Sequence, residues 1–234
     1  MRNILQLMIF LTASTVLAQL PQELLKTAQK TDVFDSYVGS VYTNKKYQNA
    51  SIIAEKTGTF DAPVRYNIFN DALEYTEGSK LYEIVKTPTT HVRIGNDYFY
   101  YCNFKNERGF NNHGYFVLVE LNEQYRIYKK YDLKIIEPKA MDANTGSAQI
   151  GKIKAIETYY LEENGTAIVL PTKKSEILAM FSDKKDELKD YIKKEKIKVR
   201  KADDLVKLVS KYNALKNIDA NPSRSLLSNR AQNN

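Results

Sequence analysis

The 234-residue chain contains one cysteine, two histidines, nine glycines and no tryptophan. A lone Cys102 cannot form a disulfide within the chain, so the core itself has to stabilise the fold. The cysteine and histidines lack the paired spacing of a structural zinc site, and the scattered glycines form neither a phosphate-binding loop nor a dinucleotide fingerprint. The sequence therefore predicts no metal and no cofactor.

The Gly-x-Ser-x-Gly elbow of the α/β-hydrolases is also absent. Asp71 and Glu74 form a carboxylate pair that could serve in glycoside hydrolysis if the two groups faced a cleft about 5–9 Å apart. Acidic residues near turns are more often solvated. A carboxylate-based extracytoplasmic hydrolase therefore stays an alternative and is not the favoured interpretation.

The N-terminus has the three parts of a cleavable secretory signal. Met1-Arg2-Asn3 is a basic start, residues 4–18 are mostly apolar, and Val16-Leu17-Ala18 places small residues before Gln19. The apolar run is shorter than the roughly 20 residues of a membrane-spanning helix. We therefore expect residues 1–18 to be a cleaved signal peptide, and the mature protein to be periplasmic, outer-membrane-associated or extracellular.

Composition divides the mature chain into three further parts. Residues 19–172 hold 18 basic and 19 acidic side chains and favour strands, whereas residues 173–216 hold 14 basic and 8 acidic side chains and favour helices. Residues 217–234 are polar and without periodicity, so a disordered tail is expected. The prediction is a β-rich domain (19–172), helices that pack on it (173–216) and a tail.

Short alternating runs separated by turn residues cover the predicted β-rich domain, residues 19–172. Gly95-Asn96 is typical of a tight hairpin, and Tyr98 to Phe104, which includes Cys102, has the pattern of a buried strand. Residues 103–114 and 137–152 are expected to be long loops. The predicted fold class is α+β, with a curved antiparallel meander followed by C-terminal helices.

Several short phrases of the sequence occur together in a known group of proteins. They are Gly39-Ser40-Val41-Tyr42-Thr43-Asn44 with Tyr47 and Ala50, Arg65-Tyr66-Asn67 with Asp71 and Glu74, Gly114-Tyr115-Phe116, Phe181, residues 184–189, and residues 203–208 ahead of Tyr212-Asn213. In these phrases the chain resembles a family of uncharacterised exported proteins of Gram-negative bacteria. The resemblance implies export and a β-then-α layout, and it implies no activity.

Polar groups beside aromatic ones give the best guess at a ligand site. The proposed pocket rim consists of Arg65, Tyr66, Asn67, Tyr98, Tyr100 and Tyr115. Aromatic residues are also ordinary cross-strand partners, so a packed sheet is the competing interpretation.

Basic side chains also recur in the helical part. Contact with an anionic surface could use Lys184, Lys185, Lys189 and Lys193. Interleaved acids make a solvated helix face the simpler interpretation, and export argues against nucleic acid as a partner.

The function that these features favour is a non-enzymatic binding or interaction protein of the cell envelope. Its partner would be an unknown envelope protein or an apolar ligand. The first alternative is a carrier that holds a lipid or another apolar molecule in a half-open sheet.

Overall fold

The computed structural model describes residues 20–139 and 149–216. The predicted signal peptide, the predicted tail and most of the predicted loop at 137–152 lie outside these residues. The described strands form one sheet and are β1 (Leu25–Thr27), β2 (Gln48–Ala54), β3 (Gly58–Asn67), β4 (Ala72–Glu77), β5 (Lys80–Ile84), β6 (Thr90–Ile94), β7 (Asp97–Lys105), β8 (Asn111–Leu121), β9 (Arg126–Ile136), β10 (Lys152–Glu163) and β11 (Thr166–Val169).

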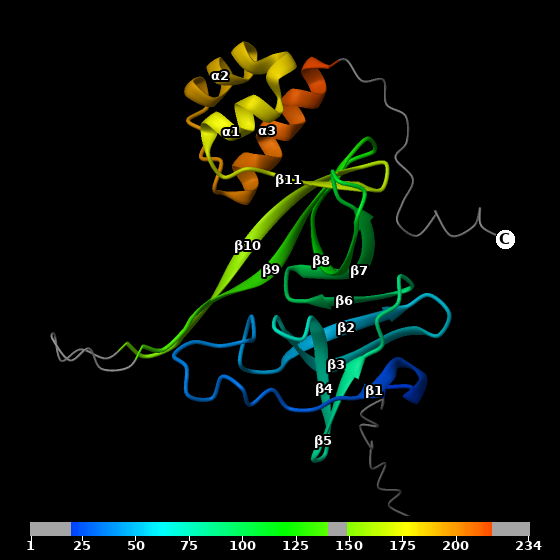
Figure 1. The fold of residues 1–234 in the computed structure, drawn as a ribbon. Coiled ribbons are helices and arrows are strands. Elements are labelled where there is room, and N and C mark those ends of the chain that lie inside the picture. Colours follow the sequence, from blue (N-terminus) through cyan, green and yellow to red (C-terminus); the bar gives the residue numbers. More distant parts are fainter. Residues whose placement is uncertain (1–19, 140–148, 217–234) are drawn as a thin grey trace, which may run out of the picture.

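Neighbours in the sheet are mostly antiparallel and joined by tight turns, in the order β1-β5-β4-β3-β2-β6-β7-β11-β10-β9-β8. The predicted hairpin at Gly95-Asn96 is confirmed, since it joins β6 to β7 and Gly95 has φ of 59°. The strands are followed by α1 (Lys174–Met180), α2 (Lys185–Lys194) and α3 (Ala202–Leu215). The α+β fold class, a mostly antiparallel meander followed by helices, is confirmed (Figure 1).

Strands β7 to β11 close on themselves, because β7 pairs with β8 on one side and with β11 on the other. We call this part the strand ring. Each of its strands sends at least one buried side chain to a shared interior, which consists of Cys102, Phe104, Phe116, Tyr128, Tyr160 and Ala167. The aromatic rings touch edge to face, for example Phe116 and Tyr160 at 5.4 Å between ring centres. The interior of the ring is thus filled by the protein's own side chains.

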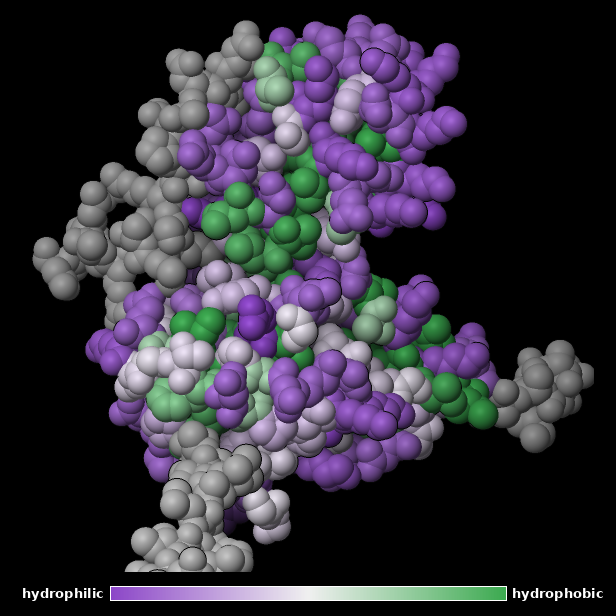
Figure 2. All heavy atoms as spheres, turned by 180° about the vertical axis from the view of Figure 1, so that it is seen from behind, coloured by the Kyte–Doolittle hydropathy of each residue, from purple (hydrophilic) through white to green (hydrophobic). Residues whose placement is uncertain are grey.

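Two more apolar cores lie outside the ring. The first is built from β2 to β7 and the outer faces of β8 and β9, with Ile52, Val64 and Tyr66 at its centre. The second lies where the three helices cover the ring at β9 and β10 (Figure 1), and it includes Ile127 and Leu205. Seen from behind, hydrophobic residues are exposed where the helical part meets the sheet (Figure 2).

The loop expected at residues 103–114 is wrong in its length. Strands β7 and β8 pair as far as Lys105 and Asn111, so only residues 106–110 form the loop. The side-chain oxygen of Asn106 accepts hydrogen bonds from the backbone N–H groups of Arg108 and Phe110, which closes this short turn. The polar residues of 103–114, which suggested a long loop, therefore lie partly in strands β7 and β8. The expectation for Cys102 is confirmed, because it is buried within β7.

Candidate functional site

An irregular segment between β1 and β2 forms one wall of the candidate site. Val41 and Thr43 exchange backbone hydrogen bonds with the end of β3, and Val38 does so with the start of β10. Gly39 makes the second contact possible, because its φ is 125° and a Cβ atom there would collide with the carbonyl of Ile153. The segment therefore bridges two parts of the sheet that are distant in sequence.

Arg65 on β3 lies directly opposite Glu74 on β4 in the antiparallel register. The guanidinium donates from Nε and Nη2 to Glu74 Oε2 at 2.9 and 2.7 Å, and the Asn67 amide donates to Glu74 Oε1 at 2.7 Å. Glu74 is 1% exposed, so these bonds replace the water that a buried carboxylate would otherwise need. Both oxygens of Glu74 are therefore engaged in holding Arg65 and Asn67.

Two tyrosines enclose the guanidinium of Arg65. Its central carbon lies 3.8 Å from the ring centre of Tyr42 and 4.5 Å from that of Tyr47, which are cation–π distances. Nη2 also donates to the Tyr42 hydroxyl at 2.8 Å. Burial, together with the nearby charge of Glu74, raises the pKa of Tyr42 to about 12, so this hydroxyl is protonated at neutral pH.

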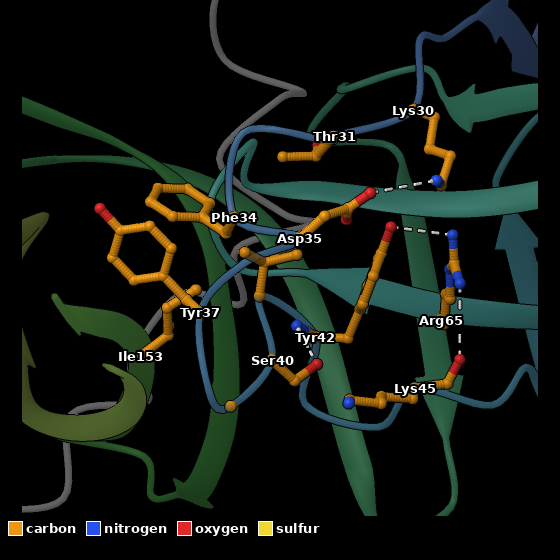
Figure 3. Close-up of a pocket in the computed structure, with 12 residues that line it drawn as sticks. Lys30, Thr31, Phe34, Asp35, Tyr37, Ser40, Tyr42, Lys45, Arg65 and Ile153 are labelled. Atoms are coloured by element: carbon orange, nitrogen blue, oxygen red, sulfur yellow. Dashed lines mark hydrogen bonds and ion pairs between the residues drawn. The ribbon is translucent and has the colours of Figure 1, made fainter. Parts of the chain in front are cut away.

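A pocket of about 260 Å³ opens beside this stack. Figure 3 shows its two different ends: the Phe34, Tyr37 and Ile153 side chains lie at one, and the charged Lys45 and Arg65 lie at the other with Lys30 and Asp35. The aromatic end is ordered by an edge-on contact of Phe34 and Tyr37 at 5.3 Å. The pocket thus offers apolar surface and positive charge to the same ligand.

The charges at the polar end are unequally neutralised. Lys30 is paired with Asp32 at 2.7 Å and lies 3.8 Å from Asp35, and Arg65 is neutralised by Glu74. None of the ion pairs among the described residues includes Lys45, and only its carbonyl is engaged, as an acceptor for Arg65 Nη1 at 3.4 Å. Lys45 is therefore the cation most available to an acidic ligand.

The six residues of the predicted rim do not form one site. Arg65 and Asn67 lie together on one face of β3, but Tyr66 points to the opposite face because side chains alternate along a strand. Tyr66 meets Tyr115 there, with ring centres 6.1 Å apart and both rings buried in the first core. Of the predicted residues, only Arg65 lines the pocket.

Tyr98 and Tyr100 lie apart from both the Arg65 pocket and the Tyr66–Tyr115 contact. They stack on each other at 5.0 Å, and Tyr100 lies 4.6 Å from the ring of His91. His91 is 3% exposed and neither ring nitrogen has a hydrogen-bond partner among the described residues. Burial lowers the pKa of His91, so the ring is neutral at pH 7.

Asp71 and Glu74, the acid pair considered for hydrolysis, belong to separate networks. Asp71 accepts hydrogen bonds from the Tyr66 hydroxyl and from the backbone N–H of Tyr115, whereas Glu74 binds Arg65 as described above. Burial raises the pKa of Asp71. Gly114 permits this arrangement, because a Cβ atom there would lie 2.8 Å from Asp71 Oδ2. Both carboxylates are occupied by neighbours of their own chain.

The predicted basic residues lie on the helical part. Lys185, Lys189 and Lys193 are exposed and follow one another at four-residue steps along α2, whereas Lys184 is half-buried just before it. This stripe and the pocket beside Arg65 share no residues.

Sequence reasoning missed the aromatic half of the pocket. Phe34 and Tyr37 lie in a stretch without periodicity, so no strand or helix pattern marked them. The hairpin register pairs Arg65 with Glu74 and gives no signal for Tyr42. Gly39, quoted above for the resemblance, is a signal for this segment, because glycine can adopt the positive φ that a close backbone approach requires.

Within residues 20–139 and 149–216, no three His, Cys, Asp or Glu residues are grouped so that they could bind a metal ion. None of the helices described there has the length and apolarity needed to cross a bilayer. Comparison with known proteins found no matching family model, no similar curated protein and no similar solved structure.

Proposed function

We propose that the protein is exported and acts in the cell envelope as a non-enzymatic binding protein whose ligand site is the pocket beside Arg65. The observation that carries this proposal is the pairing of an aromatic end with Lys45, which is in no ion pair with another described residue, in one preformed pocket. Such a site fits a small amphiphile with one acidic group. The acid would meet Lys45, and the apolar body would contact Phe34 and Tyr37.

The stack around Arg65 supports binding in preference to catalysis. The guanidinium is fixed by Glu74, Tyr42 and Tyr47, so it forms a rigid floor that loses little entropy when a ligand arrives. Catalysis by paired acids would need free carboxylates that face one cleft, and Asp71 and Glu74 each hold their own neighbours. The hydrolase alternative is therefore not favoured.

The filled interior of the strand ring bears on the apolar-carrier alternative. Phe104, Phe116, Tyr128 and Tyr160 occupy the space that a lipid chain would need. A wholly apolar ligand would have to bind elsewhere. The mixed pocket beside Arg65 therefore favours a ligand with a charged end.

Ligand chemistry can be tested with matched probes by isothermal titration calorimetry. The probes are 3-phenylpropionate and hexanoate, with 3-phenyl-1-propanol and 1-hexanol as uncharged counterparts. We expect the acids to bind about two- to fivefold more tightly, which is the contribution of one partly exposed charge pair. Lys45→Gln should remove this preference, whereas Lys56→Gln, an exposed lysine outside the pocket, should keep it.

Phe34→Ala should weaken the acids and the alcohols alike, because it removes apolar contact and no charge. Equal affinity of acids and alcohols for the natural protein, or hydrolytic turnover by the purified protein, would contradict the proposal. Pull-down from an envelope extract then searches for a protein partner.

Export is tested separately by expressing the full chain in a Gram-negative host. N-terminal sequencing of the envelope fraction should begin at Gln19. A full-length product that stays in the cytosol would contradict export.

A further inference from the structure

A second concave surface lies between the strand ring and the helices, and it shares no lining residue with the Arg65 pocket. This groove has a volume of about 710 Å³ and is lined by the ends of β10 and β11, by α1 and by α3. Its floor is ordered, because Phe181 and Tyr212 stack at 4.1 Å between ring centres. Val169 of β11 is 51% exposed beside it, although valine is apolar. The groove thus presents a preformed apolar surface to solvent.

Among the residues that the structure describes, none pairs with one edge of β11 along this groove beyond Thr166. β10 covers the other edge through four residue pairs, whereas β7 pairs with β11 only at Thr166. The Leu170 N–H donates to the Tyr159 carbonyl at 2.8 Å, so alternation along the strand turns the backbone groups of Val169 away from β10. An edge with outward N–H and C=O groups is a template for another extended chain.

The border of the groove is acidic. Glu107, Glu163 and Glu176 line it, against Lys216 as the basic residue. Glu176 is paired with Lys173 at 2.8 Å, and the ion pairs found among the described residues include neither Glu107 nor Glu163. This charge favours a basic occupant, although the adjacent helical part is rich in lysine.

We propose that the groove is a docking site for an extended segment of a partner protein in which apolar and basic residues alternate. The segment adds to the open edge of β11 by backbone hydrogen bonds at Val169. Its apolar side chains lie over Met180 and Ile168, and its basic side chains approach Glu107 and Glu163. This is strand addition, in which the backbone supplies affinity and alternate side chains supply specificity. The proposal goes beyond the ligand pocket and uses none of its residues.

The test uses the absence of tryptophan from the chain. The probe is the synthetic peptide acetyl-Trp-Lys-Val-Lys-Val-Lys-Val-Lys-amide, whose tryptophan emission is the only such signal in a mixture with the protein. The control peptide has glutamate in place of lysine. We expect saturable binding of the lysine peptide, and binding of the glutamate peptide at least about tenfold weaker because it meets the acidic border.

Two protein variants test the two parts of the site. Val169→Pro removes the outward N–H and should weaken binding at least about fivefold, whereas Val169→Ile keeps the N–H and the apolar surface and should leave affinity unchanged. Glu163→Gln should weaken binding about two- to fivefold. Glu187→Gln on α2, outside the groove, is its matched control. Circular dichroism checks that each variant is folded.

Absence of saturable binding, equal affinity of both peptides, or an unchanged affinity in folded Val169→Pro would overturn the proposal. Two other occupants give distinct results. Tighter peptide binding by Leu226→Ser/Leu227→Ser would assign the groove to the chain's own C-terminal segment. Concentration-dependent dimerisation that Val169→Pro abolishes would assign it to a second copy. Either outcome overturns the assignment to a partner protein.

Discussion

Glu74→Gln tests whether the buried carboxylate stabilises the fold and the pocket together. The substitution keeps the side-chain shape but removes the negative charge that three donor groups share, namely two nitrogens of Arg65 and the amide of Asn67. Breaking a fully buried ion pair costs about 3–5 kcal/mol. The Arg65 side chain is 16% exposed, so water can solvate part of the freed charge. We therefore expect the free energy of unfolding to fall by about 2–3 kcal/mol, which is at or below the lower limit of that range.

Urea denaturation followed by far-ultraviolet circular dichroism measures this change, and the melting temperature should fall by about 4–12 °C for a chain of this size. The matched control is Glu83→Gln on the adjacent strand. Its partner Lys26 is 72% exposed, so the cost should stay below about 0.5 kcal/mol. The double variant Arg65→Met/Glu74→Gln should lose at least about 1 kcal/mol less free energy of unfolding than the two single variants lose in sum. Equal costs for Glu74→Gln and Glu83→Gln would refute the reasoning.

Three further predictions concern other buried groups. Gly114→Ala should reduce the free energy of unfolding by at least about 2 kcal/mol in denaturant titrations, because a Cβ at φ of 148° meets the Asp71 carboxylate. The control is Gly58→Ala, which is also at positive φ but has open space around it and should cost less. Equal costs would count against the Asp71 contact. Burial lowers the pKa of His91 in the folded protein, so below about pH 6.5 the unfolded chain binds a proton that the folded protein does not bind. The free energy of unfolding should therefore fall between pH 7 and pH 5, and His91→Gln should flatten this dependence. An unchanged slope in the variant would contradict the prediction. Burial raises the pKa of the Cys102 thiol, so Ellman's reagent should modify it only in denaturant, and fast modification of the native protein would disprove that.

The local part of the fold could be predicted from the sequence. The turn residues at Gly95-Asn96 and the helix-favouring composition of residues 173–216 act over near neighbours, so the sequence alone indicates a hairpin and a helical part. Closure of the strand ring could not be predicted. It depends on one parallel contact between Thr166 and Lys105, which are far apart in sequence, and no local preference encodes such a pairing.

The candidate site was only partly predictable for a related reason. Arg65, Tyr66 and Asn67 are neighbours in sequence, but strand geometry sends Tyr66 into the first core and its two neighbours to the outer face. Period-two alternation alone would have separated them. Phe34 and Tyr37 line the pocket from an irregular segment whose close approach to Ile153 requires Gly39. No periodic pattern in the sequence predicts the conformation of this segment.

Strand β9 places consecutive or nearby side chains in all three cores. Ile127 packs under the helices, Tyr128 fills the strand ring, and Tyr131 and Leu133 pack against the first core. Loosening this one strand would remove contacts from all three cores at once. The parts of the protein that carry the pocket and the groove therefore share one strand, and we expect them to unfold in a single transition.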